Sequence, residues 1–193
     1  MRLTQKIFTV PNALTTARIM LSPVIGYCLL KNMYEPALAL TLANGTTDFL
    51  DGWYARKYKA TSNLGKLLDP IADKFFIFST IAPLVYTGII PVYLGGIIIV
   101  RDVTILFGSY KYYSSKHFIQ SRFRPTFLSK INTSIQISYI IATIASNAVD
   151  VFKGNNYFQF IELMKVLVCS TSIATSMQYF SIFRRLTSIP KKS

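Results

Sequence analysis

Four aspartates lie in one short stretch of this chain, and they make up half of its eight acidic residues. The stretch runs from Asp48 to Asp73 and follows the pattern D-x2-D-G-x2-A-R-x8-G-x3-D-x3-D. Long apolar runs flank it, and carboxylates in such surroundings are costly unless a cation holds them. Because carboxylate oxygens are the ligands that Mg²⁺ and Mn²⁺ prefer, the stretch predicts a divalent metal site.

The spacing of these aspartates favours a shared site. Asp48 and Asp51 are three residues apart, and Asp69 and Asp73 are four apart, so each pair lies on one face of a helix. Two antiparallel helices joined by a short polar loop can bring all four carboxylates together at one depth. Two ions about 3.5–4 Å apart, bridged by carboxylates, are a common arrangement for phosphoryl displacement.

Small residues accompany the acids within the pattern. Gly52 and Ala55 follow the first pair, and Gly65 precedes the second. Their lack of bulk would let a flat or phosphate-bearing ligand approach the backbone, although small residues also serve helix packing in membranes. Arg56 either reaches to the membrane interface or grips a phosphate group.

The elements that carry these residues are predicted from the long apolar runs. The chain has 193 residues, 51% of them hydrophobic, and a net charge of +13. We expect one all-α membrane domain over 1–193, because a membrane-spanning helix needs roughly 20 mostly apolar residues. The six predicted spans are 12–30, 36–54, 67–86, 91–110, 127–149 and 157–183. The basic residues lie between apolar runs, which argues against a nucleic-acid-binding surface.

Charge placement supports six spans. With that number, fifteen of the 21 basic residues fall on the side that holds both termini. Lys31 and Lys153 fall on the other side. Such a bias places both termini on the positive-inside face of the membrane. Residues 1–6 contain no cleavable signal of the usual length.

Two basic residues outside the acidic stretch are further candidates. Arg101 lies midway along the fourth predicted span, next to Asp102. It either forms a buried pair with Asp102 or binds a phosphate that enters the membrane domain. Lys130 opens the fifth predicted span, where it serves as an interfacial anchor or as a second phosphate ligand.

The full acidic pattern resembles the signature of the CDP-alcohol phosphatidyltransferase family, and all eight fixed residues match. The resemblance implies a six-helix membrane enzyme, a homodimer, that transfers a phosphatidyl group from a CDP-linked lipid to an alcohol and releases CMP. It also implies that the first three aspartates hold metal, and that Asp73 contributes to the metal site and acts as general base. The implied CDP-binding residues are Gly52, Ala55, Arg56 and Gly65. Thr16 and Arg18, on the first predicted helix, are weaker candidates for the nucleotide site.

Three further segments, 10–19, 99–103 and 124–133, resemble the branch of this family that contains the mitochondrial-type cardiolipin synthases. This resemblance implies CDP-diacylglycerol as donor, phosphatidylglycerol as acceptor, and the mitochondrial inner membrane with the active site on its matrix side. In the wider family, the basic residues at the positions of Arg101 and Lys130 bind the acceptor's phosphate.

Two alternatives remain open at this point. Glycerol 3-phosphate also carries a phosphate, so Arg101 and Lys130 do not choose between it and phosphatidylglycerol. A chain that uses glycerol 3-phosphate would be a phosphatidylglycerophosphate synthase. Carboxylates within a membrane also mark ion pathways, so a divalent-cation transporter is the alternative from another class.

Overall fold

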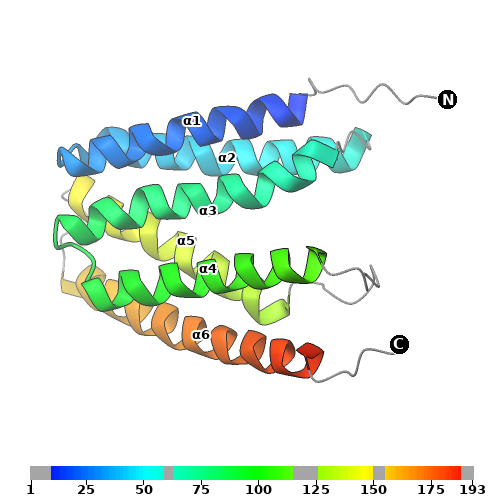
Figure 1. Ribbon diagram of the computed structural model, residues 1–193. Coiled ribbons are helices and arrows are strands. Elements are labelled where there is room, and N and C mark those ends of the chain that lie inside the picture. Colours follow the sequence, from blue (N-terminus) through cyan, green and yellow to red (C-terminus); the bar gives the residue numbers. More distant parts are fainter. Residues whose placement is uncertain (1–9, 59–62, 115–125, 150–154, 188–193) are drawn as a thin grey trace, which may run out of the picture. The chain divides into compact units, whose positions relative to one another are not determined.

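The computed structural model describes residues 10–58, 63–114, 126–149 and 155–187. Side chains are described for 14–47, 71–106, 126–149, 156–182 and 184. The described part of the chain is all-helical and contains six helices (Figure 1). These helices are α1 (Val10–Leu30), α2 (Tyr34–Tyr58), α3 (Asn63–Tyr86), α4 (Val92–Ser114), α5 (Phe127–Ala148) and α6 (Asn155–Thr187). The prediction of an all-α chain with six helices is confirmed.

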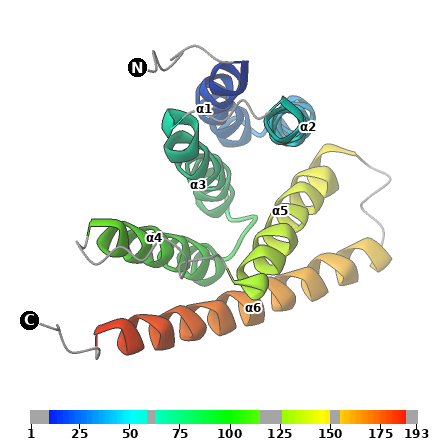
Figure 2. The same ribbon diagram turned by 90° about the vertical axis from the view of Figure 1, so that its right-hand side faces the viewer.

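The helices fall into two compact units. Unit 1 comprises residues 1–90 and 140–154, and unit 2 comprises residues 91–139 and 155–193. In unit 1, α1 packs against both α2 and α3, and in unit 2, α4 packs against α6 (Figure 2). The first part of α5, up to Tyr139, belongs to unit 2. The single domain expected over 1–193 stays a prediction.

Turn chemistry explains why α1 ends where it does. Asn32 follows the helix with a φ of 58°, a left-handed conformation that Asn tolerates better than most residues. The Asn32 N–H donates to the Leu29 carbonyl, and the Met33 N–H donates to the Cys28 carbonyl at 2.8 Å. This pair of bonds is a Schellman cap, which satisfies carbonyls that the helix leaves open. The chain therefore reverses within three residues, and α2 runs antiparallel to α1.

A close helix contact holds α1 against α3. A Cβ atom added at Gly26 would lie 2.7 Å from the backbone carbonyl oxygen of Ser79 on α3. On the same two helices, Ile25, Leu29, Ile81 and Leu84 are completely buried. Since interiors are packed at crystal-like density, only a residue without a side chain permits this approach.

We therefore expect Gly26→Ala to separate α1 from α3 and to lower the free energy of unfolding by about 1–3 kcal/mol. Thermal unfolding in detergent would measure this as a lower Tm. The matched control is Gly45→Ala on α2, where an added Cβ meets nothing within 4 Å. That change should leave Tm unchanged or raise it, because Ala is the better helix former. Equal Tm values for the two variants would contradict the packing argument.

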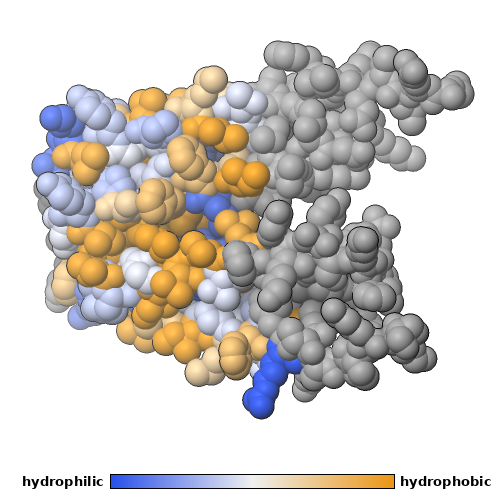
Figure 3. Space-filling view, in the orientation of Figure 1, coloured by the Kyte–Doolittle hydropathy of each residue, from blue (hydrophilic) through white to orange (hydrophobic). Residues whose placement is uncertain are grey.

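Large apolar side chains are exposed along the helices. Examples are Met20 at 69% exposed, Phe78 at 53% and Phe180 at 69%. Figure 3 shows hydrophobic side chains over much of the visible face and hydrophilic ones at the left edge. Among the described residues, one helix, Asn156–Ile182, is long and apolar enough by itself to cross a membrane. The remaining predicted spans stay a prediction.

Candidate active site

The acidic signature occupies the end of α2 and the start of α3. Asp48 and Asp51 lie on α2, and Asp69 and Asp73 lie on α3. The side chains of Asp48, Asp51 and Asp69 lie outside the described residues. Among the side chains that are described, no cluster of three or more His, Cys, Asp or Glu could hold a metal. The predicted metal site therefore stays a prediction.

Chain connectivity nevertheless limits how far apart the two pairs lie. Five residue steps separate Tyr58 from Asn63, so these helix ends are at most about 18 Å apart. Figure 1 shows α2 and α3 running antiparallel, with these ends on the same side of unit 1. At 1.5 Å per residue, Asp51 lies about 10 Å before the end of α2, and Asp69 lies about 9 Å after the start of α3. The two pairs are therefore at similar heights.

At this point, α2 and α3 both extend beyond the predicted spans. The second helix was expected to end at 54 and the third to begin at 67, but α2 continues to Tyr58 and α3 begins at Asn63. No Gly or Pro interrupts residues 53–58. A helix pairs the N–H and C=O groups of its own backbone, which favours continuing both helices into the polar stretch. Ala55, Arg56 and Gly65 are consequently helical, and the connecting loop is shorter than expected.

Asp73 has an ionic partner that the sequence reasoning missed. The Arg18 guanidinium, on α1, donates through Nη1 to Asp73 Oδ1 at 3.3 Å. Arg18 is only 4% exposed, whereas the Asp73 side chain is 54% exposed. A buried cation therefore contacts Asp73 Oδ1, while more than half of the Asp73 side chain is exposed.

Two buried hydroxyl groups on α1 form hydrogen bonds with Arg18, that of Thr15 with the guanidinium and that of Ser22 with the backbone carbonyl. Arg18 Nη2 donates to Thr15 Oγ1 at 3.5 Å, and Ser22 Oγ donates to the Arg18 carbonyl at 2.8 Å. Thr15 and Ser22 are buried, and they lie three residues before and four residues after Arg18 on the same helix face. An arginine within a predicted span needs an acidic partner, which was the signal available in the sequence. Thr16, predicted to bind CDP, is exposed on the same helix.

We predict that Arg18 positions Asp73. Arg18→Gln should lower kcat about tenfold or more, because a hydrogen bond to a charged group contributes about 1.5–3 kcal/mol. Arg18→Lys should recover part of the loss, since it keeps the charge but not the planar donor group. In a double-mutant cycle, Arg18→Gln should cost little further activity once Asp73 is Asn. A merely structural change at Arg18 would lower kcat by the same factor whether residue 73 is Asp or Asn. If the losses of the two single variants multiply in the double variant, the positioning role is contradicted.

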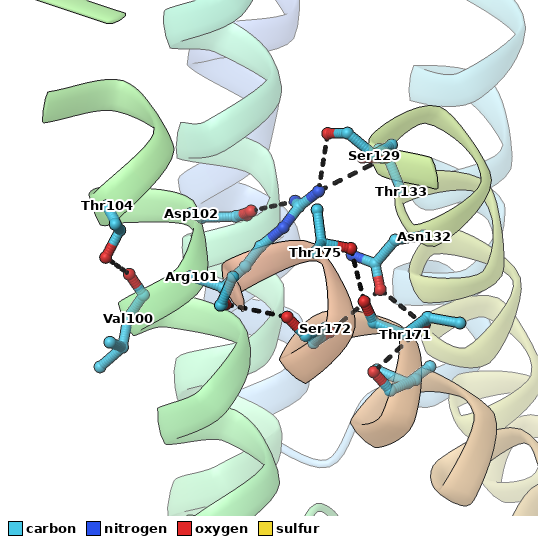
Figure 4. Close-up of polar contacts among 12 residues, drawn as sticks. Val100, Arg101, Asp102, Thr104, Ser129, Asn132, Thr133, Thr171, Ser172 and Thr175 are labelled. Atoms are coloured by element: carbon cyan, nitrogen blue, oxygen red, sulfur yellow. Dashed lines mark hydrogen bonds and ion pairs between the residues drawn. The ribbon is translucent and has the colours of Figure 1, made fainter. Parts of the chain in front are cut away.

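Arg101, on α4, is buried at 1% exposed and bound on two sides (Figure 4). Its Nη1 donates to Asp102 Oδ1 at 2.5 Å, and its Nη2 donates to Ser129 Oγ on α5 at 2.9 Å. The pairing with Asp102, one of the two expected alternatives, is thus present. Nε of Arg101 has no hydrogen-bond acceptor among the described residues.

Lys130 follows Ser129 on α5 and is exposed. Consecutive helical residues point about 100° apart. Lys130 therefore does not share the helix face on which Ser129 meets Arg101. The prediction that Lys130 binds an acceptor phosphate is left untested by this geometry.

A second polar cluster joins α5 to α6 and was not anticipated from the sequence. Asn132 Oδ1 accepts from Thr171 Oγ1 at 2.7 Å and from Ser172 Oγ at 3.0 Å. Asn132 and Ser172 are completely buried. In Figure 4 the Asn132 side chain points from α5 toward these two residues. The sequence signal was the regular spacing of polar residues on α5, one turn apart within an apolar helix.

The profile of the CDP-alcohol phosphatidyltransferase family matches residues 8–178 of the chain. The chain belongs to the CDP-alcohol phosphatidyltransferase family. The match includes every residue of the acidic signature and both α4 and α5. It also includes Arg18 and Asn132, the residues whose contacts the sequence reasoning missed.

Among the curated relatives are cardiolipin synthases. The chain is 36% identical over 151 residues to the probable cardiolipin synthase (CMP-forming) of Drosophila melanogaster, covering 70% of the chain and 47% of the relative. It is 35% identical over 190 residues to the cardiolipin synthase (CMP-forming) of Homo sapiens, covering 91% of the chain and 61% of the relative. The chain thus spans about half to three fifths of the length of these relatives.

Another curated relative, which is not named a cardiolipin synthase, matches nearly the whole chain. It is the chloroplastic CDP-diacylglycerol–glycerol-3-phosphate 3-phosphatidyltransferase 1 of Oryza sativa subsp. japonica. This relative is 28% identical over 197 residues, which cover 94% of the chain and 59% of the relative. Over nearly the whole chain, the similarity is therefore greater to the human cardiolipin synthase.

Proposed function

We propose that this phosphatidyltransferase is a cardiolipin synthase, which transfers a phosphatidyl group from CDP-diacylglycerol to phosphatidylglycerol and releases CMP. The observation that carries the proposal is the 35% identity to a cardiolipin synthase over 91% of the chain. The resemblance of residues 124–133 to this branch of the family supports the same acceptor.

Asp73 is the general base in this proposal. A hydroxyl is a poor nucleophile and needs a base within hydrogen-bond reach. The acceptor oxygen bonds to the phosphatidyl phosphorus, the phosphoanhydride bond to CMP breaks, and Asp73 takes the hydroxyl proton. Arg18, at 3.3 Å from Asp73 Oδ1, keeps the carboxylate in position for that transfer.

The donor set fits one or two divalent ions. Asp48, Asp51, Asp69 and Asp73 would supply carboxylate oxygens from two antiparallel helices at similar heights, which would suit Mg²⁺ or Mn²⁺. When bound, such ions offset the charge of the diphosphate and polarise the phosphorus. The other proposed CDP-binding residues are Gly52, Ala55, Arg56, Gly65 and Thr16. Arg101 and Lys130 are proposed to bind the acceptor's phosphate.

We place the protein in the mitochondrial inner membrane as a homodimer, with each chain a single domain of six membrane-spanning helices and its active site on the matrix side. Each helix has at least 21 residues, and thus a length of about 30 Å or more, which is enough to cross the hydrocarbon core of a bilayer. The exposed apolar side chains and the charge bias along the chain support the membrane location. The transporter alternative is no longer needed, because family membership accounts for the acidic cluster.

The similarity to the rice protein keeps glycerol 3-phosphate as the second candidate acceptor. The test is CMP release by the purified chain in detergent, with CDP-diacylglycerol and either Mg²⁺ or Mn²⁺. Parallel reactions would contain phosphatidylglycerol, glycerol 3-phosphate, or neither. Metal-dependent release with phosphatidylglycerol, together with formation of cardiolipin, is the expected result. Release only with glycerol 3-phosphate would replace the acceptor, and no release with either would reject the proposal.

A further inference from the structure

One face of α5 carries buried polar side chains within unit 2. Ser129, Asn132 and Gln136 follow one another at spacings of three and four residues, so they share one side of the helix. Their exposed fractions are 9%, 0% and 0%. Buried polar groups in membrane helices usually have hydrogen-bond partners. We therefore ask which polar atoms of these three side chains have a partner and which do not.

Two amide side chains on this face have polar atoms without hydrogen-bond partners among the described residues. Asn132 Nδ2 has no acceptor, although Oδ1 of the same side chain accepts two hydrogen bonds from α6. Both Nε2 and Oε1 of Gln136 lack partners. A buried polar group without a partner costs about 1–3 kcal/mol, so these positions call for a polar occupant.

The guanidinium of Arg101 adds a third unused donor in the same unit. It contacts Ser129, at the start of the α5 face, and its Nε has no acceptor in the described part of the chain. Measured along the α5 axis from Ser129, Asn132 is about 4.5 Å away and Gln136 about 10.5 Å away. The unused groups thus follow α5 in order, first a cation, then an amide donor, and last an amide with both donor and acceptor.

We propose that Asn132 and Gln136 bind the glycerol part of a phosphoglycerol headgroup whose phosphate lies at Arg101. This rests on the proposed function and assigns the recognition of the acceptor's hydroxyls. A hydroxyl both donates and accepts, and the Gln136 amide offers one acceptor and two donors to match it. The Asn132 amide donates between the phosphate end and the hydroxyl end. Phosphatidylglycerol and glycerol 3-phosphate both present this chemistry.

The test compares two acceptor lipids in the wild-type protein and in Gln136→Leu. Phosphatidylglycerol carries a middle hydroxyl, whereas phosphatidyl-1,3-propanediol lacks it but keeps the phosphate and a terminal hydroxyl. The wild type should prefer phosphatidylglycerol by about tenfold or more in kcat/KM. Phosphatidyl-1,3-propanediol lacks the middle hydroxyl, and its binding would leave the buried Gln136 amide unpaired. Gln136→Leu should reduce this preference to nearly one, while the KM for CDP-diacylglycerol stays within about twofold.

The control is Gln178→Leu, which makes the same replacement at an exposed position of α6. It should keep the wild-type preference and the wild-type Tm. A buried water molecule that serves Gln136 would give another pattern, with a changed Tm and an unchanged preference in Gln136→Leu. An unchanged preference would therefore overturn the proposal.

Comparing an acceptor that has the middle hydroxyl with one that lacks it also separates this inference from the proposed function. If glycerol 3-phosphate proves to be the acceptor, the preference is measured between it and 1,3-propanediol monophosphate. If no acceptor gives CMP, the Tm shift caused by each of the two lipids is measured without donor. A larger shift with phosphatidylglycerol, lost in Gln136→Leu, would support the headgroup site even though the proposed reaction had failed. Equal shifts in the wild type would reject the site.

Discussion

Asp73→Asn should lower the rate of CMP release by about 10²–10⁴, the range that general-base catalysis contributes. The amide has nearly the same shape as the carboxylate, and its oxygen can still accept from Arg18, which lies 3.3 Å from Asp73 Oδ1. It cannot take up the proton of an attacking hydroxyl. The loss should therefore appear in kcat, while the KM for CDP-diacylglycerol changes by less than about threefold. Initial rates over a range of donor concentrations would separate the two constants.

Glu35→Gln is the matched control for that experiment. Glu35 is an exposed carboxylate in the first turn of α2, at the opposite end of the helix from the signature. Its replacement should leave both kcat and KM unchanged. Normal turnover in Asp73→Asn would reject the base assignment. A large rise in the KM for donor with kcat retained would instead make Asp73 a binding residue.

Asp48→Ala should strongly reduce metal-dependent CMP release. Divalent ions contribute several kcal/mol of charge stabilisation to phosphoryl transfer, and each 1.36 kcal/mol changes the rate tenfold. Removing one carboxylate from the proposed donor set should therefore cost about a thousandfold in CMP release. The same loss should follow when EDTA is added to the wild type, and excess Mg²⁺ or Mn²⁺ should then restore activity.

The metal dependence of two variants makes this prediction specific. Asp48→Asn keeps an oxygen ligand but loses the negative charge, so it should recover partial activity at high metal concentration. Asp48→Ala should not recover at any metal concentration. Full activity of Asp48→Ala at the metal concentration that saturates the wild type would exclude Asp48 from the metal site.

The sequence predicted the helices well because their signals are local. Long apolar runs bounded by Asn32, by Gly88 and by Pro91 indicated ends at 30 and 86, and both ends are observed. The polar stretch between α2 and α3 was predicted less well. Hydropathy indicates where a helix is apolar, but it does not indicate where a polar helical segment stops, so both helices extend farther than expected.

The chain by itself also determined its family, because eight residues at fixed spacings identify the acidic signature. It indicated which side chains share a helix face, since that depends only on the helical repeat. It did not indicate which neighbouring helix a face meets. Only the tertiary structure decided that Arg18 on α1 meets Asp73 on α3, and that Asn132 on α5 meets Thr171 on α6. These contacts join residues 55 and 39 positions apart in the sequence, where spacing carries no information about contact.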